Sequence, residues 1–198
     1  DGMAVATIMA VMEDNTLKHG PIEGFITADE ETCMYGVNHL AADTLHGDIL
    51  LNMDNETMGE FVIGSAGGVN ISATMQYKEV APEAGDIAVK VCLQGLKGGH
   101  SGLEINEGRA NANKLMARFV RQAIADDDAR LCSWNGGNMR NAIPRTASAV
   151  LTIPAENLDD LKDLVAYCLE TFKNEYAGIE NEMEMTIEST IMPAAQVP

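Results

Sequence analysis

Apolar and polar side chains alternate in the second part of the chain. Residues 69–77 (VNISATMQY) place an apolar side chain at every second position, which is typical of a half-buried strand. Four more strands are predicted after it, at residues 87–96, 129–137, 146–154 and 182–190. Two amphipathic helices are predicted between them, at residues 106–128 and 155–178. From residue 87 the predicted order is β-α-β-β-α-β, which is the arrangement of a ferredoxin-like α+β sandwich.

Continuous apolar runs mark the first part of the chain instead. Residues 3–12 are apolar at nearly every position and predict a buried helix, and residues 29–45, which begin with acids, predict a second helix. Buried strands are predicted at residues 22–28, 47–54 and 59–68. Such strands between helices favour an α/β sheet that is covered on both faces. We therefore predict an α/β domain over residues 1–68 and an α+β domain over residues 69–198.

Composition narrows the classes of partner and compartment. The formal net charge of −17 repels phosphate backbones and anionic lipid, so neither nucleic acid nor a membrane surface is an expected partner. The four cysteines, Cys33, Cys92, Cys132 and Cys168, are widely spaced and predict buried free thiols in a reducing compartment. The apolar stretch at the start is too short to span a bilayer. We expect a cytoplasmic protein.

Carboxylates follow two of the predicted strands. Asp29, Glu30 and Glu31 come after the first strand, and Asp54 ends the next one. Strand ends in open α/β sheets are where ligands bind, and carboxylates there suit a metal site with a base acting on water. The alternative is structural: the three acids complement a helix dipole, and Asp54 begins a turn.

Two polar loops in the second domain are further candidates. His100 lies among glycines at positions 98, 99 and 102, where it is accessible and able to donate to an oxyanion. The loop at residues 135–145 is rich in amides and carries Arg140 and Arg145, which suit a substrate carboxylate. The alternatives are a plain polar loop histidine and a hairpin loop. Glu104 and Asn106 can equally cap the helix that follows.

Taken in order, these segments resemble the aminoacyl-histidine dipeptidases (peptidase D, or cytosol non-specific dipeptidases), a branch of the co-catalytic zinc peptidases. The matching segments are HGPIE, DEE, GDILLNMDNETMGE, GSAGG, GLKGGHSGLEI, GRANANKL and NGGNMRNAIPR. Their order across residues 1–150 makes the likeness specific. The resemblance implies part of a zinc-binding catalytic α/β domain in residues 1–68, followed by a ferredoxin-like lid and dimerisation domain in residues 69–198.

The resemblance also implies roles for single residues. Glu30 is similar to the general base, and Glu31 and Asp54 are similar to metal ligands. His100 corresponds to the lid histidine that stabilises the tetrahedral intermediate, and Asn141 resembles a lid residue that contacts substrate. Arg140, which precedes Asn141 in the same loop, is expected to bind substrate as well. The implied cofactor is a pair of zinc ions in each complete active site, with cobalt or manganese as alternatives. The implied substrate is a dipeptide of the Xaa-His type, and the implied partner is a second copy bound through the lid.

The chain departs from the family's pattern at its ends. The family's upstream H-x-D motif and its late histidine ligand are absent, and Asp1-Gly2 resembles the pair that directly follows a bridging aspartate. We therefore expect an internal fragment that does not bind both zinc ions or turn over substrate by itself. Two alternatives stay open: a related amidohydrolase (a deacylase or an aminopeptidase), and a non-catalytic dimerisation module of the lid type.

Overall fold

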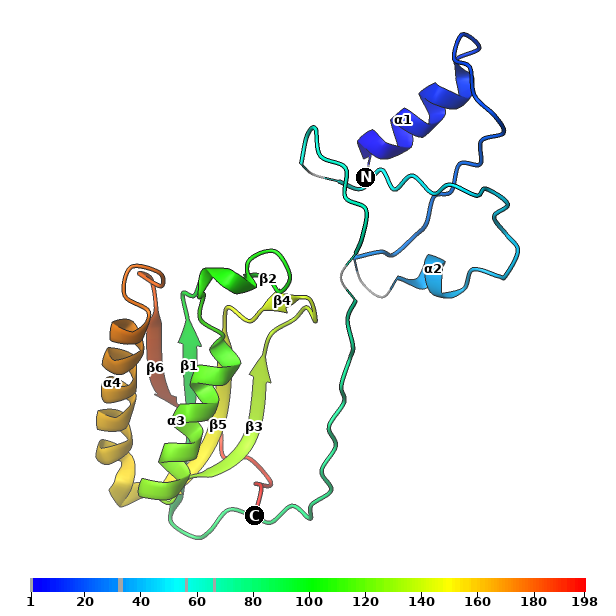
Figure 1. Cartoon of the computed structure of the whole chain (residues 1–198). Helices are drawn as coiled ribbons and strands as arrows, with labels where there is room; N and C mark the ends of the chain where they lie inside the picture. Colours follow the sequence, from blue (N-terminus) through cyan, green and yellow to red (C-terminus); the bar gives the residue numbers. More distant parts are fainter. Residues whose placement is uncertain (1, 32–33, 56, 66) are drawn as a thin grey trace. The chain divides into compact units, whose positions relative to one another are not determined.

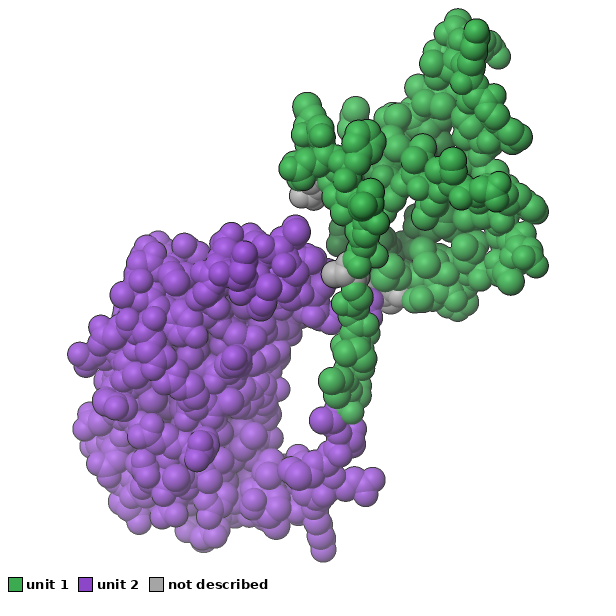
Figure 2. All heavy atoms as spheres, viewed as in Figure 1, with its two compact units in different colours: residues 1–72 green, residues 73–198 purple. Residues whose placement is uncertain are grey.

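The computed structural model describes residues 2–31, 34–55, 57–65 and 67–198. It divides into two compact units, residues 1–72 and residues 73–198 (Figure 2). No helix in the described part of the chain combines the length and the apolar character needed to cross a membrane.

The second unit is a helix-on-sheet sandwich. The four strands of its larger sheet are β1 (Asp86–Gln94), β3 (Arg130–Gly136), β5 (Ala147–Pro154) and β6 (Glu184–Ser189). They form a sheet of order β3-β5-β1-β6 in which all neighbours are antiparallel. Helices α3 (Ala112–Asp126) and α4 (Leu158–Glu175) cover the same face of this sheet (Figure 1). This order is that of the ferredoxin-like sandwich, so the fold predicted for the lid is confirmed.

The hydrophobic core lies between the sheet and the two helices. Val89, Val91 and Leu93 alternate along β1 and are buried. Six residues of α3 recur at helical spacing and are buried against them: Ala112, Leu115, Met116, Phe119, Val120 and Ala123. Asn111 caps the N-terminus of the helix, and its side chain accepts a hydrogen bond from the Lys114 backbone N–H. The cap is therefore neither Glu104 nor Asn106, and the helix starts later than the sequence pattern predicted.

The chain ends of this unit pair with the sheet. Val80 and Gln196 form an antiparallel bridge, and the Val197 N–H donates to the Leu131 carbonyl at 2.8 Å. The buried Thr152 hydroxyl donates to the Gln196 side chain. These bonds attach the C-terminal segment to β5 and β3 without adding a named strand.

A buried carboxyl group lies at the C-terminal end of α3. Asp127 is 6% exposed, and among the described residues its Oδ2 has no hydrogen-bond partner. Burial, together with the charges of Asp160, Asp126 and Asp128, raises the pKa of the Asp127 carboxyl. Because the folded-state pKa lies above the unfolded one, the protonated carboxyl contributes stability at low pH. This contribution is lost as the pH rises through the folded-state pKa.

We therefore expect Asp127→Asn to raise the free energy of unfolding at pH 7 by about 1 kcal/mol, the scale of one buried polar group. The gain should shrink when the pH is lowered from 7 to about 4, because the native carboxyl takes up its proton at a higher pH than the unfolded one does. Urea unfolding at the two pH values checks this. Asp163→Asn, which removes the same charge from an exposed position on α4, is the matched control and should change little. A D127N protein that is less stable at pH 7 would contradict the prediction.

The first unit differs from the sequence prediction. It contains helices α1 (Gly2–Glu13) and α2 (Tyr35–Asn38), and no described residue of this unit lies in a strand. The strands predicted at residues 22–28, 47–54 and 59–68 are therefore wrong for the described residues, which do not include residue 66. The strand predicted at residues 69–77, which runs from the first unit into the second, does not form either. A strand forms only when a neighbouring strand pairs with its backbone N–H and C=O groups, and the described residues of these runs have no such neighbour. Their apolar side chains are exposed, as Ile49 (81%) and Phe61 (96%) show.

Three further predictions need correction or completion. The predicted buried helix at residues 3–12 forms as α1, but none of its residues is buried. The helix predicted at residues 29–45 is reduced to α2, and part of it, residues 32–33, lies outside the described residues. Of the cysteines, Cys168 is buried and Cys92 and Cys132 are half-buried, all as free thiols, whereas Cys33 lies outside the described residues. Burial raises the pKa of the Cys132 and Cys168 thiols, so these two are poor nucleophiles.

Candidate functional site

A short two-stranded ribbon brings the two candidate loops of the second unit together. Strand β2 (Gly99–His100) pairs antiparallel with β4 (Ala142–Ile143), so His100 lies opposite Ala142. The Ser101 N–H also donates to the Asn141 carbonyl at 2.8 Å. His100 and the Arg140–Asn141 pair, which are far apart in the sequence, therefore share one end of the molecule's lid sandwich. Sequence patterns missed this ribbon because each of its strands is only two residues long.

The glycines before His100 are required by backbone conformation and by space. Gly98 has φ +66° and Gly99 has φ +138°, where a side chain is strained. A Cβ at position 99 would lie 2.5 Å from both the Arg109 guanidinium and the Glu104 carboxylate. Gly99 thus lets two charged side chains pack directly against the backbone that leads to His100, and Gly98 leaves the same room for the side chain of Arg145.

The imidazole of His100 has a defined hydrogen-bonding role. Its Nδ1 accepts the backbone N–H of Gly102 at 3.1 Å and that of Leu103 at 3.2 Å. A nitrogen that accepts carries no proton, so the neutral ring is protonated on Nε2. His100 is exposed. The loop therefore presents an accessible histidine whose Nε2–H can donate to a substrate oxygen.

An ion-pair cluster supports the backbone of this loop. The His100 backbone N–H donates to Glu104 Oε2 at 2.6 Å, and Arg109 Nη2 donates to Glu104 Oε1 at 2.8 Å. Arg109 Nη1 reaches the Gly98 carbonyl at 2.8 Å, and its Nε and Nη2 both bond Glu107. The N–H of His100, followed by the Arg109 charge, lowers the pKa of the Glu104 carboxyl. Glu104 was predicted as a cap at most, and its role here depends on a contact that spacing alone does not reveal.

A groove lies beside the histidine loop. Its volume is about 510 Å³, and its lining includes Ser101, Asn138, Arg140 and Ile143. Asn113 shapes one wall, because its amide donates to the Gly136 carbonyl and accepts the Trp134 indole N–H at 3.0 Å. Arg140 is exposed and Asn141 is half-buried. A cationic side chain and several amides around a groove of this size suit a small ligand that carries a carboxylate.

The predicted carboxylates of the first unit do not form a metal centre in this structure. Glu30 and Glu31 lie in an exposed turn, and Asp54 lies in an exposed segment outside any helix or strand. Among the described residues, no three His, Cys, Asp or Glu side chains are grouped so that they could hold a metal ion. Carboxylates have the right chemistry for a divalent cation, but as arranged these three do not fit a zinc pair. We derive no chemical step through a metal from this geometry.

Sequence patterns missed a polar contact in the first unit that involves Glu23. Its Oε2 accepts the N–H groups of His46 and Gly47 at 2.8 and 3.0 Å, and its Oε1 lies 3.0 Å from His46 Nδ1. These contacts, with the His46 backbone N–H first, lower the pKa of the Glu23 carboxyl. Glu23, the last residue of the HGPIE segment, thus has a structural role: it joins two segments of the unit.

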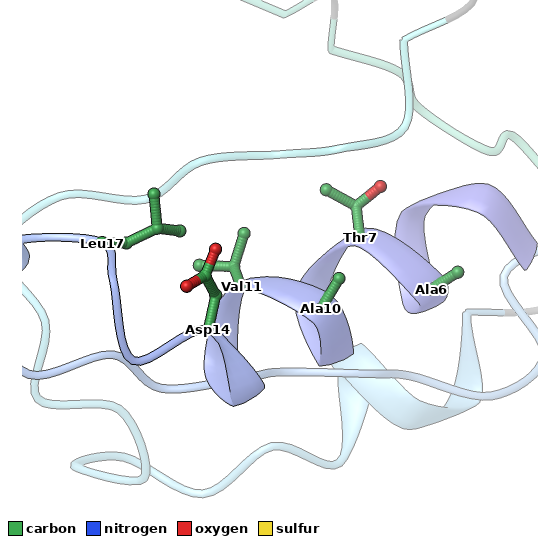
Figure 3. Close-up of a pocket in the computed structure, with 6 residues that line it drawn as sticks. All are labelled: Ala6, Thr7, Ala10, Val11, Asp14 and Leu17. Carbon is green, nitrogen blue, oxygen red and sulfur yellow. The ribbon is translucent and has the colours of Figure 1, made fainter.

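A shallow pocket along α1 offers less chemistry. Its volume is about 310 Å³, and Figure 3 shows it beside the small side chains of Ala6, Thr7 and Ala10. Its one carboxylate, Asp14, already accepts the Thr16 N–H and hydroxyl at 2.7 and 2.6 Å. The groove beside His100 is therefore the better candidate for a functional site.

The family match covers the part of the chain that contains His100 and the groove beside it. Residues 91–180 match the model of the peptidase dimerisation domain (M20_dimer). The chain is 41% identical over 189 residues to the cytosol non-specific dipeptidase of Escherichia coli (strain K12), which covers 96% of this chain. The chain is therefore similar to a dipeptidase over nearly all of its length. A crystal structure of the aminoacylhistidine dipeptidase from Vibrio alginolyticus matches 98% of it, with a TM-score of 0.69 and 38% identity.

The length of these relatives sets the scope of the match. The chain spans 39% of the Escherichia coli protein and 40% of the Vibrio alginolyticus chain. The match to the dimerisation domain begins within β1 and ends just after α4, so it covers most of the ferredoxin-like sandwich and includes His100. The resemblance inferred from the sequence motifs is thereby confirmed.

Proposed function

We propose that this chain contributes the lid and part of the catalytic domain to a metal-dependent dipeptidase. The observation that carries the proposal is the 41% identity to a dipeptidase over nearly the whole chain. The exposed His100, with a donor Nε2–H beside a groove that contains Arg140, supports it. The substrate is a dipeptide, for which we propose the Xaa-His type.

The proposed mechanism assigns one task to each candidate residue. Glu30 acts as the general base that takes a proton from the attacking water and passes it to the leaving amine. His100 Nε2–H donates to the oxyanion of the tetrahedral intermediate. Arg140 and Asn141 bind the substrate beside the groove, with the guanidinium directed at the carboxylate of the dipeptide.

The metal site is a proposal, because the described residues do not form one in the structure. Glu31 and Asp54 are the proposed ligands, and two zinc ions are the proposed cofactor, with cobalt or manganese as alternatives. A bound metal would supply water activation and polarisation of the scissile carbonyl.

We also propose a homodimer formed through the lid, supported by the match to the dimerisation domain. The cytoplasmic location rests on the free thiols and on the word "cytosol" in the relative's name.

An assay of the full-length gene product tests this function. We expect hydrolysis of Xaa-His and other dipeptides, loss of activity after dialysis against a chelator, and recovery with zinc. N-acyl amino acids and longer peptides, the substrates of a deacylase or an aminopeptidase, should react at least about 100-fold more slowly. Preference for an acylated substrate, or activity that is indifferent to chelator and zinc, would refute the dipeptidase proposal. No hydrolysis together with a stable dimer would favour the dimerisation module.

A further inference from the structure

A buried glutamate closes the base of the histidine loop. Glu180 is 3% exposed and lies in the segment between α4 and β6. Its Oε2 accepts the Lys97 N–H and its Oε1 accepts the Ala110 N–H, both at 2.8 Å. Residues 97 and 110 are the two ends of the loop that carries His100, so one carboxylate holds both ends.

The hydrogen-bond partners of the Glu180 carboxylate are unusual for a residue that only fills the core. No ion pair found among the described residues includes it, so its charge is compensated there by backbone N–H groups. A buried carboxylate without a cationic partner is costly, and an apolar side chain would fill the same space at lower cost. What the carboxylate does, and an apolar group cannot, is join two backbone donors from opposite ends of one loop.

A second set of hydrogen bonds holds the same loop from inside. The Glu180 contacts are called the first clamp, and the Arg109 contacts the second clamp. Arg109, whose side chain is 18% exposed, holds the Gly98 carbonyl and the Glu104 carboxylate, and Glu104 in turn holds the His100 N–H. Arg109 directly precedes Ala110, which is bound by Glu180. The two clamps therefore act on adjacent residues, and together they connect the buried Glu180 to the backbone of His100.

We propose that Glu180 is a positioning residue, which acts through Arg109 and Glu104 to hold His100 with its Nδ1 facing the loop and its Nε2–H facing substrate. Fixing the backbone at residues 97, 98, 100 and 110 keeps the Gly102 and Leu103 N–H groups directed at Nδ1. This pairing sets the tautomer that makes Nε2 a donor. The proposal rests on the oxyanion role of His100 stated above.

Nuclear magnetic resonance of the 198-residue chain tests the clamp without any activity. At about pH 9, where imidazole side chains are neutral, native His100 should show one tautomer protonated on Nε2. In Glu180→Gln, one backbone donor faces an amide N–H in place of an oxygen. In this variant we expect the two ring nitrogen signals of His100 to move toward each other. We also expect the Gly102 and Leu103 amides to exchange with solvent at least about tenfold faster.

Matched variants separate positioning from plain stability. Glu175→Gln makes the same change in the pair with Arg118, which lies on the two helices and makes no contact with the loop in the hydrogen bonds found. It should leave the His100 signals unchanged. Arg109→Lys, which cannot reach Gly98 and Glu104 together, is a second route if Glu180→Gln fails to fold, with Arg118→Lys as its control. His100 signals and amide exchange that are unchanged in both loop variants would overturn the clamp.

Kinetics of the full-length gene product then test what the clamp is for. We expect Glu180→Gln to lower kcat about 10- to 100-fold with KM changed less than about twofold, since a displaced donor costs transition-state stabilisation. A changed tautomer with native kcat would overturn the positioning role. If His100→Ala is fully active, the proposed function of His100 fails instead, and the spectra still decide whether Glu180 holds the loop.

Discussion

Replacing Glu30 by glutamine is expected to lower kcat for dipeptide hydrolysis by about 10²- to 10⁴-fold in the full-length gene product, the range that a general base contributes. Glutamine keeps the shape of the side chain but cannot take a proton from water. Because Glu30 lies in an exposed turn and makes no core contact, the fold should be retained. The measurements are kcat, circular dichroism and metal content by mass spectrometry.

The control for this variant is Glu60→Gln, the same change at another exposed position of the first unit. It should leave kcat within about twofold, the scale of a surface substitution. Native activity in Glu30→Gln would remove Glu30 from the proposed mechanism. A loss of activity accompanied by a loss of bound metal would instead assign Glu30 to the metal site.

Replacing His100 by asparagine is expected to lower kcat by about 10²- to 10³-fold with little change in KM, as for the loss of one oxyanion donor. Asparagine has a side-chain oxygen that can accept the Gly102 N–H in place of Nδ1, so the local turn is preserved. It has no group equivalent to Nε2–H. The change therefore removes the proposed donor and spares the loop.

Steady-state kinetics with a dipeptide substrate checks this prediction. His39→Asn is the matched control, because His39 is also exposed and its Nδ1 contacts only the Tyr35 carbonyl of its own helix turn among the bonds found. It should remain active. A His100→Asn protein with native kcat, or one whose loss lies wholly in KM, would contradict an oxyanion role and indicate ground-state binding.

The helices and strands of the lid could be predicted because their sequences agree with their environment. Apolar residues at helical spacing from Ala112 to Ala123 have a sheet to cover, and Val89 to Leu93 alternate toward two helices. The same reasoning failed for residues 47–54 and 59–68. Their apolar character is real, but a strand also needs a neighbouring strand for its backbone hydrogen bonds, and the described residues supply none.

The candidate site shows the same limit at finer scale. His100, Arg140 and Asn141 could be identified as candidates from residue types among glycines and amides. Their proximity could not, because it depends on a ribbon of two-residue strands. Glu180 gave no sequence signal, since a single glutamate near a helix end resembles any surface acid.

The sequence by itself determined the ferredoxin-like order of the second unit, the candidate residues and the resemblance to the dipeptidases. Periodicity and local composition encode these properties, and they survive in any context in which the chain folds. Only the tertiary structure decided that Nδ1 of His100 accepts two backbone N–H groups and that Glu180 and Arg109 hold the loop around it. Such contacts join residues up to 83 positions apart. They depend on how the sandwich brings loop ends together, and residue spacing does not carry that information.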